Sequence, residues 1–208
     1  MTTIGTAGNR ESPAPPFVVS FDLAGKTGVC YGRVGDKHPH VSTWALPKSL
    51  SRPLRLLHFS NMCDEFFATH PVDYLCYEAP MGIMVAAGVG SREDTMLLLR
   101  GLVGVLECCG ARANIKGITS YDVQAAREHL TGYRRLPKGT GKNVVWRTAS
   151  MLGVKCADEN QSDAFAGFSY CCSLLNPRIA HLVTPLWASI NEHDPHGSRG
   201  RTARRAQR

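Results

Sequence analysis

The chain has 208 residues and a formal net charge of +7, and 43% of its residues are hydrophobic. This composition supports one buried core, and no apolar run reaches the ~20 residues that a membrane-spanning helix needs. A membrane protein and a wholly disordered chain are therefore excluded, and without a signal-like N-terminus the expected location is cytoplasmic.

Composition divides the chain into three segments. Residues 1–15 are rich in Gly, Thr, Ser and Pro and are predicted to form a flexible leader, residues 16–187 the folded domain, and residues 188–208 a basic flexible tail. The eight cysteines show no C-x-x-C spacing. They are interpreted as reduced thiols, and a zinc site is not expected.

The first half of the domain predicts an antiparallel meander followed by a helix and a strand. Short apolar runs predict strands over residues 17–22, 28–34 and 41–46. Apolar positions at near-helical spacing predict a helix over 52–69, and a strong strand follows over 73–78.

The second half is mainly helical. It is predicted to contain an almost wholly apolar helix over 92–109, a strand over 113–119, a helix from Ser120 to about residue 130 with Ser120 as its N-cap, and helices over 143–152 and 160–175. This alternation predicts an α/β fold, a mixed sheet with helices on its faces.

Three acidic residues occupy positions where such a fold could bring their side chains together. Asp22 ends the first strand, Glu78 ends the strand over 73–78, and Asp163 lies near the start of the last helix. Carboxylates gathered at one point repel each other unless a divalent cation neutralises them. The pattern therefore predicts a metal-dependent nuclease.

Each acid also has a plainer interpretation by itself. Asp22 could cap a turn, Glu78 could be a solvated strand end, and Asp163 could be an ordinary first-turn helix acid. Their coincidence with the right order of strands and helix favours a shared site.

Positive charge is concentrated in two groups. One comprises Arg127, Arg134, Arg135, Lys138, Lys142 and Arg147, and the other lies in the tail. Such groups bind polyanions by releasing counterions from phosphates, although a solvated face with a solubilising tail would have the same composition. The adjacent acids favour polyanion binding.

A nucleotide cofactor is not expected. Gly25, Lys26 and Thr27 follow a strand, but the first glycine of a P-loop would fall at Ser20. The same turn resembles the phosphate loop of the actin and sugar kinase superfamily. Those proteins need two such domains, and this chain has room for one.

Three segments together resemble the RuvC Holliday junction resolvases. They are FDLAGKTG (residues 21–28), YEAP (77–80) and NQSDA (160–164). The resemblance covers about residues 17–175. It implies the ribonuclease H-like fold, a mixed five-stranded sheet with helices on both faces, and a bacterial or phage-infected host cell as the setting.

The resemblance also implies a catalytic role for the acids. Asp22 would bridge two Mg²⁺ ions, with Mn²⁺ as a substitute, while Glu78 and Asp163 would each hold one. Two such ions orient the scissile phosphate, activate a water and stabilise the leaving oxygen.

The fourth ligand departs from the family pattern, which places Asp or His one turn before the last acid. In this chain that position is Asn160, which we predict to be a weak ligand. Glu159 is the reserve, and Asp158 is a further alternative if the helix starts late.

Other expected DNA contacts come from the basic loop and turn. The resemblance implies that Lys138 and Lys142 hold the DNA backbone; Lys26, Arg134 and Arg135 complete the basic set. Met81 lies in the loop where relatives often carry an aromatic wedge, which this chain lacks. Contact with bases and a mobile loop with small apolar contacts are equal alternatives for it.

Resolvases of this kind act as homodimers on branched DNA. The helix over 92–109, with Gly101 and Gly104, is the candidate interface, or its apolar surface is ordinary core. Two other functions stay open: a ribonuclease H-like nuclease acting on RNA/DNA hybrids or flaps, and a branched-DNA-binding module with a decayed active site.

Overall fold

A five-stranded mixed sheet forms the centre of the protein. The computed structural model describes residues 14–80, 90–133 and 139–177. The strands are β1 (Phe17–Asp22), β2 (Lys26–Arg33), β3 (His40–Ala45), β4 (Tyr74–Glu78) and β5 (Gly117–Tyr121), in the order β3-β2-β1-β4-β5. The first three are antiparallel, and β4 and β5 run parallel to β1.

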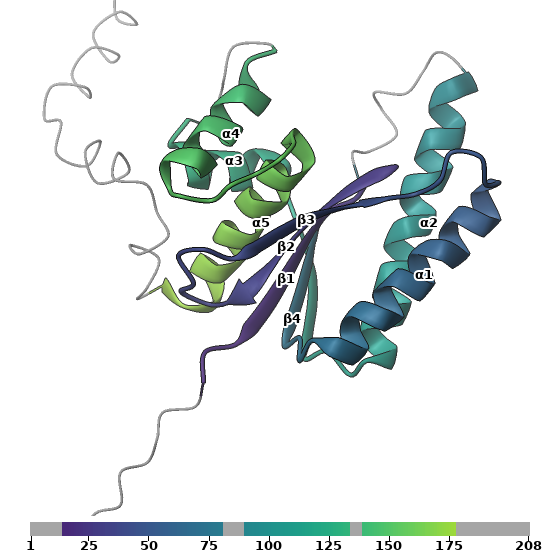
Figure 1. The fold of residues 1–208 in the computed structure, drawn as a ribbon, viewed down its shortest axis with the longest axis horizontal. Helices are drawn as coiled ribbons and strands as arrows, with labels where there is room; N and C mark the ends of the chain where they lie inside the picture. Colours follow the sequence, from purple (N-terminus) through teal and green to yellow (C-terminus); the bar gives the residue numbers. More distant parts are fainter. Residues whose placement is uncertain (1–13, 81–89, 134–138, 178–208) are drawn as a thin grey trace, which may run out of the picture.

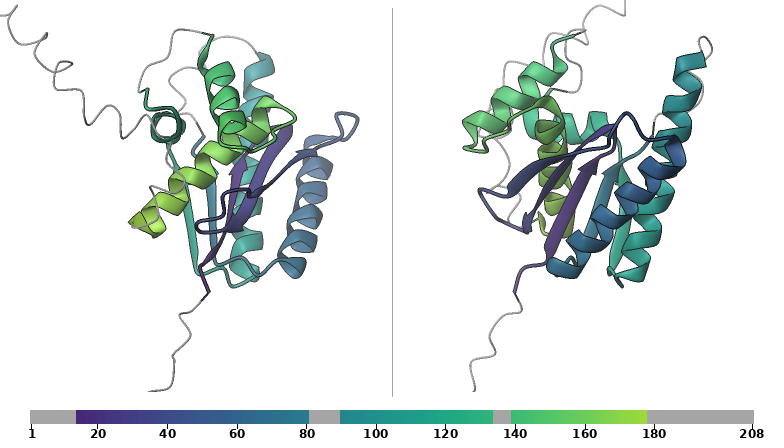
Figure 2. Two further views of the ribbon diagram at one scale, coloured as in Figure 1. Left: turned by 60° about the vertical axis from the view of Figure 1, so that its left-hand side comes forward. Right: turned by 45° about the vertical axis from the view of Figure 1, so that its right-hand side comes forward.

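Helices cover both faces of this sheet (Figure 1). One face carries α1 (Arg52–Thr69) and α2 (Gly90–Arg112); the other carries α3 (Val123–Thr131), α4 (Gly141–Met151) and α5 (Glu159–Leu175). Of the last three, α5 lies directly on the strands, and α3 and α4 pack against it (Figure 2). The predicted α/β class and the mixed five-stranded sheet are confirmed.

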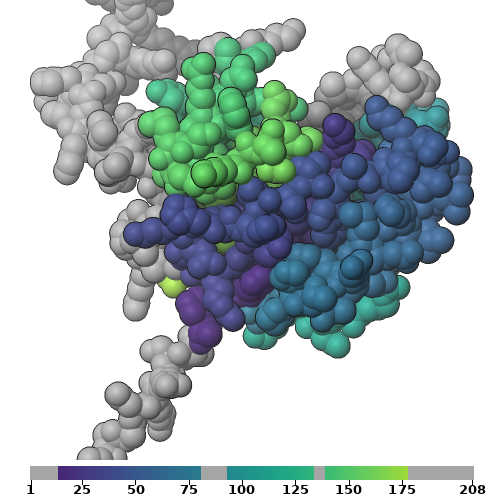
Figure 3. All heavy atoms as spheres, viewed as in Figure 1, coloured from purple at the N-terminus to yellow at the C-terminus, as the bar shows by residue number. Residues whose placement is uncertain are grey.

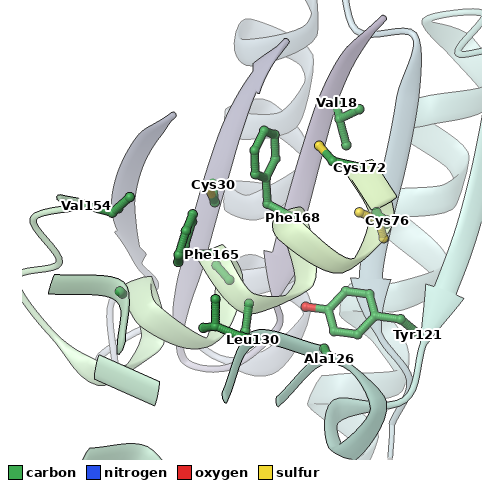
Figure 4. Close-up of a cluster of buried hydrophobic side chains, with 14 of the residues drawn as sticks. Val18, Cys30, Cys76, Tyr121, Ala126, Leu130, Val154, Phe165, Phe168 and Cys172 are labelled. Carbon is green, nitrogen blue, oxygen red and sulfur yellow. The ribbon is translucent and has the colours of Figure 1, made fainter. Parts of the chain in front are cut away.

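Each face of the sheet has its own hydrophobic core. Alternation along β1 sends Val18 toward α5 and Val19 and Phe21 toward α1 and α2. Phe165 and Phe168 of α5 fill the first core (Figure 4). Each fully buried side chain of this size contributes about 1.5–3 kcal/mol, so the two cores fix both layers on the sheet.

The segment before α3 differs from the prediction. The strand expected at 113–119 lies at Gly117–Tyr121, because α2 continues to Arg112 and the chain then turns at Asn114, whose φ is 55°. Ser120 is therefore part of β5 and is not the N-cap of α3. That cap is Asp122, whose carboxylate accepts hydrogen bonds from the backbone N–H of Gln124 (3.3 Å) and Ala125 (3.4 Å).

Two further sequence expectations concern cysteines and membranes. All eight cysteines carry free thiols, of which Cys108 alone is exposed. Within the three described ranges, no helix combines the length and apolarity that a membrane crossing requires.

Candidate functional site

Asp22 and Glu78 end adjacent parallel strands at the same edge of the sheet. Phe21 pairs with Tyr77 across β1 and β4, so the residues that follow them are neighbours. The Asp22 and Glu78 carboxyl groups share a hydrogen bond. Burial, then the charges of Glu78 and Asp163, raise the pKa of Asp22 to about 8. The proton of the pair therefore lies on Asp22, and Glu78 accepts.

The Glu78 carboxyl group experiences opposing effects. Burial raises its pKa most and the Asp163 charge adds to this, whereas the hydrogen bond from Asp22 and the charge of Arg127 lower it; the net direction is upward. Burial and neighbouring acids thus raise the pKa values of Asp22 and Glu78, which is characteristic of a functional site.

Asp163 reaches this edge because α5 lies unusually close to the sheet. Gly28, the register partner of Asp22 on β2, faces the N-terminal turn of α5. A Cβ atom on Gly28 would lie 2.0 Å from the carbonyl oxygen of Asn160. Only a residue without a side chain permits this approach, so Gly28 sets the height of Asp163 above Asp22.

A second close approach lies about two helical turns further along α5, at Gly167. A Cβ atom on Gly167 would lie 2.2 Å from the hydroxyl oxygen of Tyr121, which is buried and points from β5 toward α5 (Figure 4). The Tyr121 hydroxyl donates to the carbonyl oxygen of Phe21 (3.4 Å) and accepts from the Ser20 hydroxyl (3.3 Å). Because Tyr121 is also the register partner of Glu78 in the sheet, its backbone and side chain together contact the elements that carry all three acids.

Asp163 itself is 6% exposed and paired with Arg127 of α3. The Arg127 Nε–H donates to Oδ1 of Asp163 (3.2 Å) and the Nη2–H donates to Oδ2 (2.9 Å). This two-point geometry engages both carboxylate oxygens, and it raises the pKa of the Arg127 guanidinium even though burial opposes the charged form.

The start of α5 carries two further acids with separate partners. The Asp158 carboxylate caps the helix by accepting from the backbone N–H of Gln161 (2.9 Å) and from the Thr43 hydroxyl (2.9 Å). Glu159 forms an ion pair with Lys142 of α4 (3.0 Å), which raises the pKa of Lys142. Both alternatives to Asn160 therefore have other partners.

The predicted site residues are only partly brought together. Asp22, Glu78 and Asp163 converge, and Lys142 stands close enough for its charge to act on Asp22. Asn160 is half-buried at the start of α5, and Lys26 is exposed where β2 begins. The predicted contacts Met81, Arg134, Arg135 and Lys138 lie outside the described residues, as do most of the leader and the whole basic tail.

Sequence reasoning missed the roles of Arg127 and Tyr121. From sequence, Arg127 is one member of the basic group, and the helix predicted to begin at Ser120 includes Tyr121. A partial signal existed for Arg127, since a buried acid such as Asp163 requires a counter-charge. Nothing in the sequence indicates which of several cations supplies it.

The three acids fit a hard divalent cation, although Asp163 is already bonded to Arg127. Asp22, Glu78 and Asp163 offer only oxygen ligands, which Mg²⁺ and Mn²⁺ prefer. In the described part of the chain, no three acidic, histidine or cysteine side chains already stand as an ion cage. In the same site, Arg127 donates a hydrogen bond to each oxygen of Asp163.

Solved structures with the same architecture come from Holliday junction resolvases. Thermus thermophilus RuvC has a TM-score of 0.57 at 13% identity, with 84% of this chain and 96% of that chain covered. T. thermophilus RuvC in complex with Holliday junction substrate has a TM-score of 0.58 at 14% identity, with 79% of this chain and 96% of that chain covered. This chain has the RuvC-like resolvase fold.

The yeast mitochondrial Holliday junction resolvase Ydc2 shares this RuvC-like fold as well. Its TM-score is 0.51 at 12% identity, with 83% of this chain and 82% of that chain covered. Neither the family models nor the curated proteins include a match to this sequence. The relationship to RuvC therefore lies in the fold, and the site has to be argued from its own residues.

Proposed function

We propose that this protein is a metal-dependent endodeoxyribonuclease that cleaves Holliday junctions or other branched DNA. The observation that carries the proposal is the convergence of Asp22, Glu78 and Asp163 at one edge of a RuvC-like sheet, with perturbed protonation of the first two. Among the proteins that share the fold, T. thermophilus RuvC is described in complex with a Holliday junction substrate.

The three carboxylates are the groups that would hold the metal. Bound Mg²⁺ or Mn²⁺ supplies activation of water and charge stabilisation at the scissile phosphate. Asp22, whose pKa is raised by the charges of both other acids after burial, would be shared by two ions. Asn160, at the first turn of α5, can add a neutral oxygen.

Cations around the acids would hold the DNA backbone. Lys142 stands at the first turn of α4, which with the start of α5 forms a lobe above the β2–β3 hairpin (Figure 3). Lys26, Arg134, Arg135 and Lys138 extend this proposal along the turn and the basic loop, and Met81 is proposed to contact bases. Phosphate contacts of this kind position DNA without reading its sequence.

Cleavage of a synthetic four-way junction tests the proposed function. With Mg²⁺ or Mn²⁺, the junction should be cut faster than a linear duplex, a flap or an RNA/DNA hybrid of the same sequence. Glu78→Gln should slow cleavage by about 10³-fold or more, because a lost ligand removes several kcal/mol of transition-state stabilisation. Preferential cutting of the hybrid would instead assign a different ribonuclease H-like activity.

A second candidate function is a branched-DNA-binding module without cleavage. It is favoured by the ion pair that occupies Asp163 and by Asn160 at a position where relatives carry an ionisable ligand. Tight junction binding by the unaltered protein, with no cutting in either metal, would support this candidate over the nuclease.

Two symmetric nicks require two active sites, so we propose a homodimer formed through α2. Leu97, Gly104 and Cys108 make an exposed stripe on this helix beside a hollow of about 330 Å³. A Cβ on Gly104 would meet nothing within 4 Å, whereas one on Gly101 would lie 2.8 Å from Leu56 of α1. Gly101 therefore serves packing within the protomer, and Gly104 is the residue left open for a partner.

Leu97→Glu should convert the dimer into a monomer. The substitution places a charge in the proposed apolar interface while leaving the folded protomer unaffected, since Leu97 is 41% exposed. Sedimentation velocity measures the change, with Glu65→Gln on the exposed side of α1 as control. If the unaltered protein already sediments as a monomer at micromolar concentration, α2 is not a dimer interface.

A further inference from the structure

The ion pair between Arg127 and Asp163 lies inside the acidic cluster. Arg127 projects from α3 and Asp163 from α5, and their side chains are 27% and 6% exposed. The guanidinium donates to both oxygens of the carboxylate, at 3.2 and 2.9 Å. Its charge also acts on Glu78, whose pKa it lowers. Arg127 therefore neutralises part of the whole cluster.

Neutralisation of this kind is what a buried group of acids requires when no other cation is bound. Removing a partner from a buried ion pair costs more than the pair contributes, because a desolvated charge is left behind. In the arrangement described, one positive side chain compensates Asp163, and a shared proton removes one of the two negative charges of Asp22 and Glu78. Protein groups alone therefore offset most of the charge of the cluster, and a negative charge stays on the Asp22–Glu78 pair.

The same arrangement opposes metal binding by Asp163. Each carboxylate oxygen of Asp163 already accepts a hydrogen bond from Arg127. A divalent cation that bridges Asp163 to Asp22 and Glu78 would approach these oxygens while a fixed positive charge stands against them. Ion and guanidinium therefore compete for one carboxylate.

We propose that Arg127 is a built-in counter-ion that occupies Asp163 in the metal-free protein and is displaced when a divalent cation enters. This inference rests on the proposed function, since it takes the three acids as the ion site. Arg127 is a positioning residue here: it keeps the α5 carboxylate folded toward Asp22 and Glu78 and sets the threshold for metal binding. A static structural ion pair is the competing explanation, in which Arg127 stays bonded to Asp163 throughout.

Lys142 provides a matched comparison for this proposal. Its charge also acts on Asp22 and Asp163, but its ammonium group bonds to Glu159 and to none of the three acids. Loss of any nearby positive charge strengthens cation binding through space. Only the loss of Arg127 removes a direct competitor, so the difference between the two variants isolates displacement from general electrostatics.

Mn²⁺ affinity of the full chain, measured by calorimetry and by the electron paramagnetic resonance of free Mn²⁺, tests the proposal. Arg127→Gln should tighten binding by about tenfold, the usual size of such couplings, whereas Lys142→Gln should change it by no more than about twofold. The Mn²⁺ affinity of Arg127→Lys should lie between those of Arg127→Gln and the unaltered protein, because an ammonium group cannot bond both oxygens in the planar two-point geometry. Equal effects of Arg127→Gln and Lys142→Gln, or weaker binding by Arg127→Gln, would overturn the proposal.

A second measurement needs no variant that could misfold. The Nε–H resonance of Arg127 in the unaltered protein should be protected from exchange with water in the metal-free state. Addition of Mg²⁺ should shift this resonance and speed its exchange. A signal that stays unchanged and protected at saturating Mg²⁺ would contradict displacement of Arg127 but not the metal site itself. Failure of every variant to bind Mn²⁺ would contradict the proposed metal-dependent function as well.

Discussion

Asp22→Asn is expected to stabilise the metal-free protein and to abolish its cleavage of DNA. Burial and the neighbouring charges of Glu78 and Asp163 raise the pKa of Asp22 to about 8, so its ionised form is disfavoured in the folded state. Asparagine keeps the shape and cannot ionise. At pH 8 the variant should be more stable by roughly 1 to 3 kcal/mol. Cleavage should fall by about 10³-fold or more, since the shared metal ligand is lost.

The pH dependence of this stabilisation follows from the direction of the shift. The pKa of Asp22 is higher in the folded than in the unfolded chain, so the folded state binds the proton more tightly. The resulting stability is fully present below the unfolded pKa, near 4, and is lost as pH rises through about 8. The advantage of Asp22→Asn should therefore be largest at pH 8 to 9 and should shrink steadily toward pH 5.

Thermal unfolding with and without Mg²⁺ measures both effects. In EDTA at pH 8, the melting temperature of Asp22→Asn should exceed that of the unaltered protein. Addition of Mg²⁺ should raise the melting temperature of the unaltered protein far more than that of the variant. Glu65→Gln, which removes one exposed acid of α1, controls for net charge. A melting temperature of Asp22→Asn at or below that of the unaltered chain in EDTA would show that the three acids do not strain the fold.

The elements and the acids were accessible from sequence because both depend on local patterns. Apolar runs ending at Asp22 and Glu78 predict strands that finish in a carboxylate, and these two strands are indeed neighbours, parallel and in register. The helix over 52–69 was predicted with the bounds that the structure has. Convergence of the acids follows once strands of this kind pair, since their carboxyl ends meet at one edge of the sheet.

The partners of each acid were not accessible, because they depend on how separate elements pack. The bond from Arg127 to Asp163 joins α3 to α5, and sequence alone offers several equally placed cations in the basic group. The bounds of β5 differ from the predicted 113–119 for a related reason. Its bounds follow from pairing with β4, which places Tyr121 opposite Glu78, whereas the local sequence around Ser120 equally fits the start of a helix.

Gly28→Ala is expected to damage both the fold and the site. The added methyl would lie 2.0 Å from the carbonyl oxygen of Asn160, which is main chain and cannot rotate away. The first turn of α5 must therefore lift from the sheet or β2 must shift, at a cost of about 3 kcal/mol for overpacking. A loss of this size lowers the melting temperature by roughly 6 to 12 °C in a chain of this length. Asp163 would move with α5, so cleavage should fall even at temperatures where the variant is folded.

Gly25→Ala separates this close approach from the general effect of replacing a glycine in the β1–β2 hairpin. A methyl on Gly25 would meet only the end of the Arg55 side chain, at 3.2 Å, and that flexible group can move aside. The melting temperature and Mn²⁺ affinity of Gly25→Ala should stay near those of the unaltered protein. Gly28→Ala should weaken Mn²⁺ binding, because the Asp163 carboxylate moves away from Asp22 and Glu78. If Gly28→Ala unfolds at lower temperature yet binds Mn²⁺ as the unaltered chain does, contact between Gly28 and α5 serves stability alone and the acids are positioned by the Tyr121 contact with Gly167 instead.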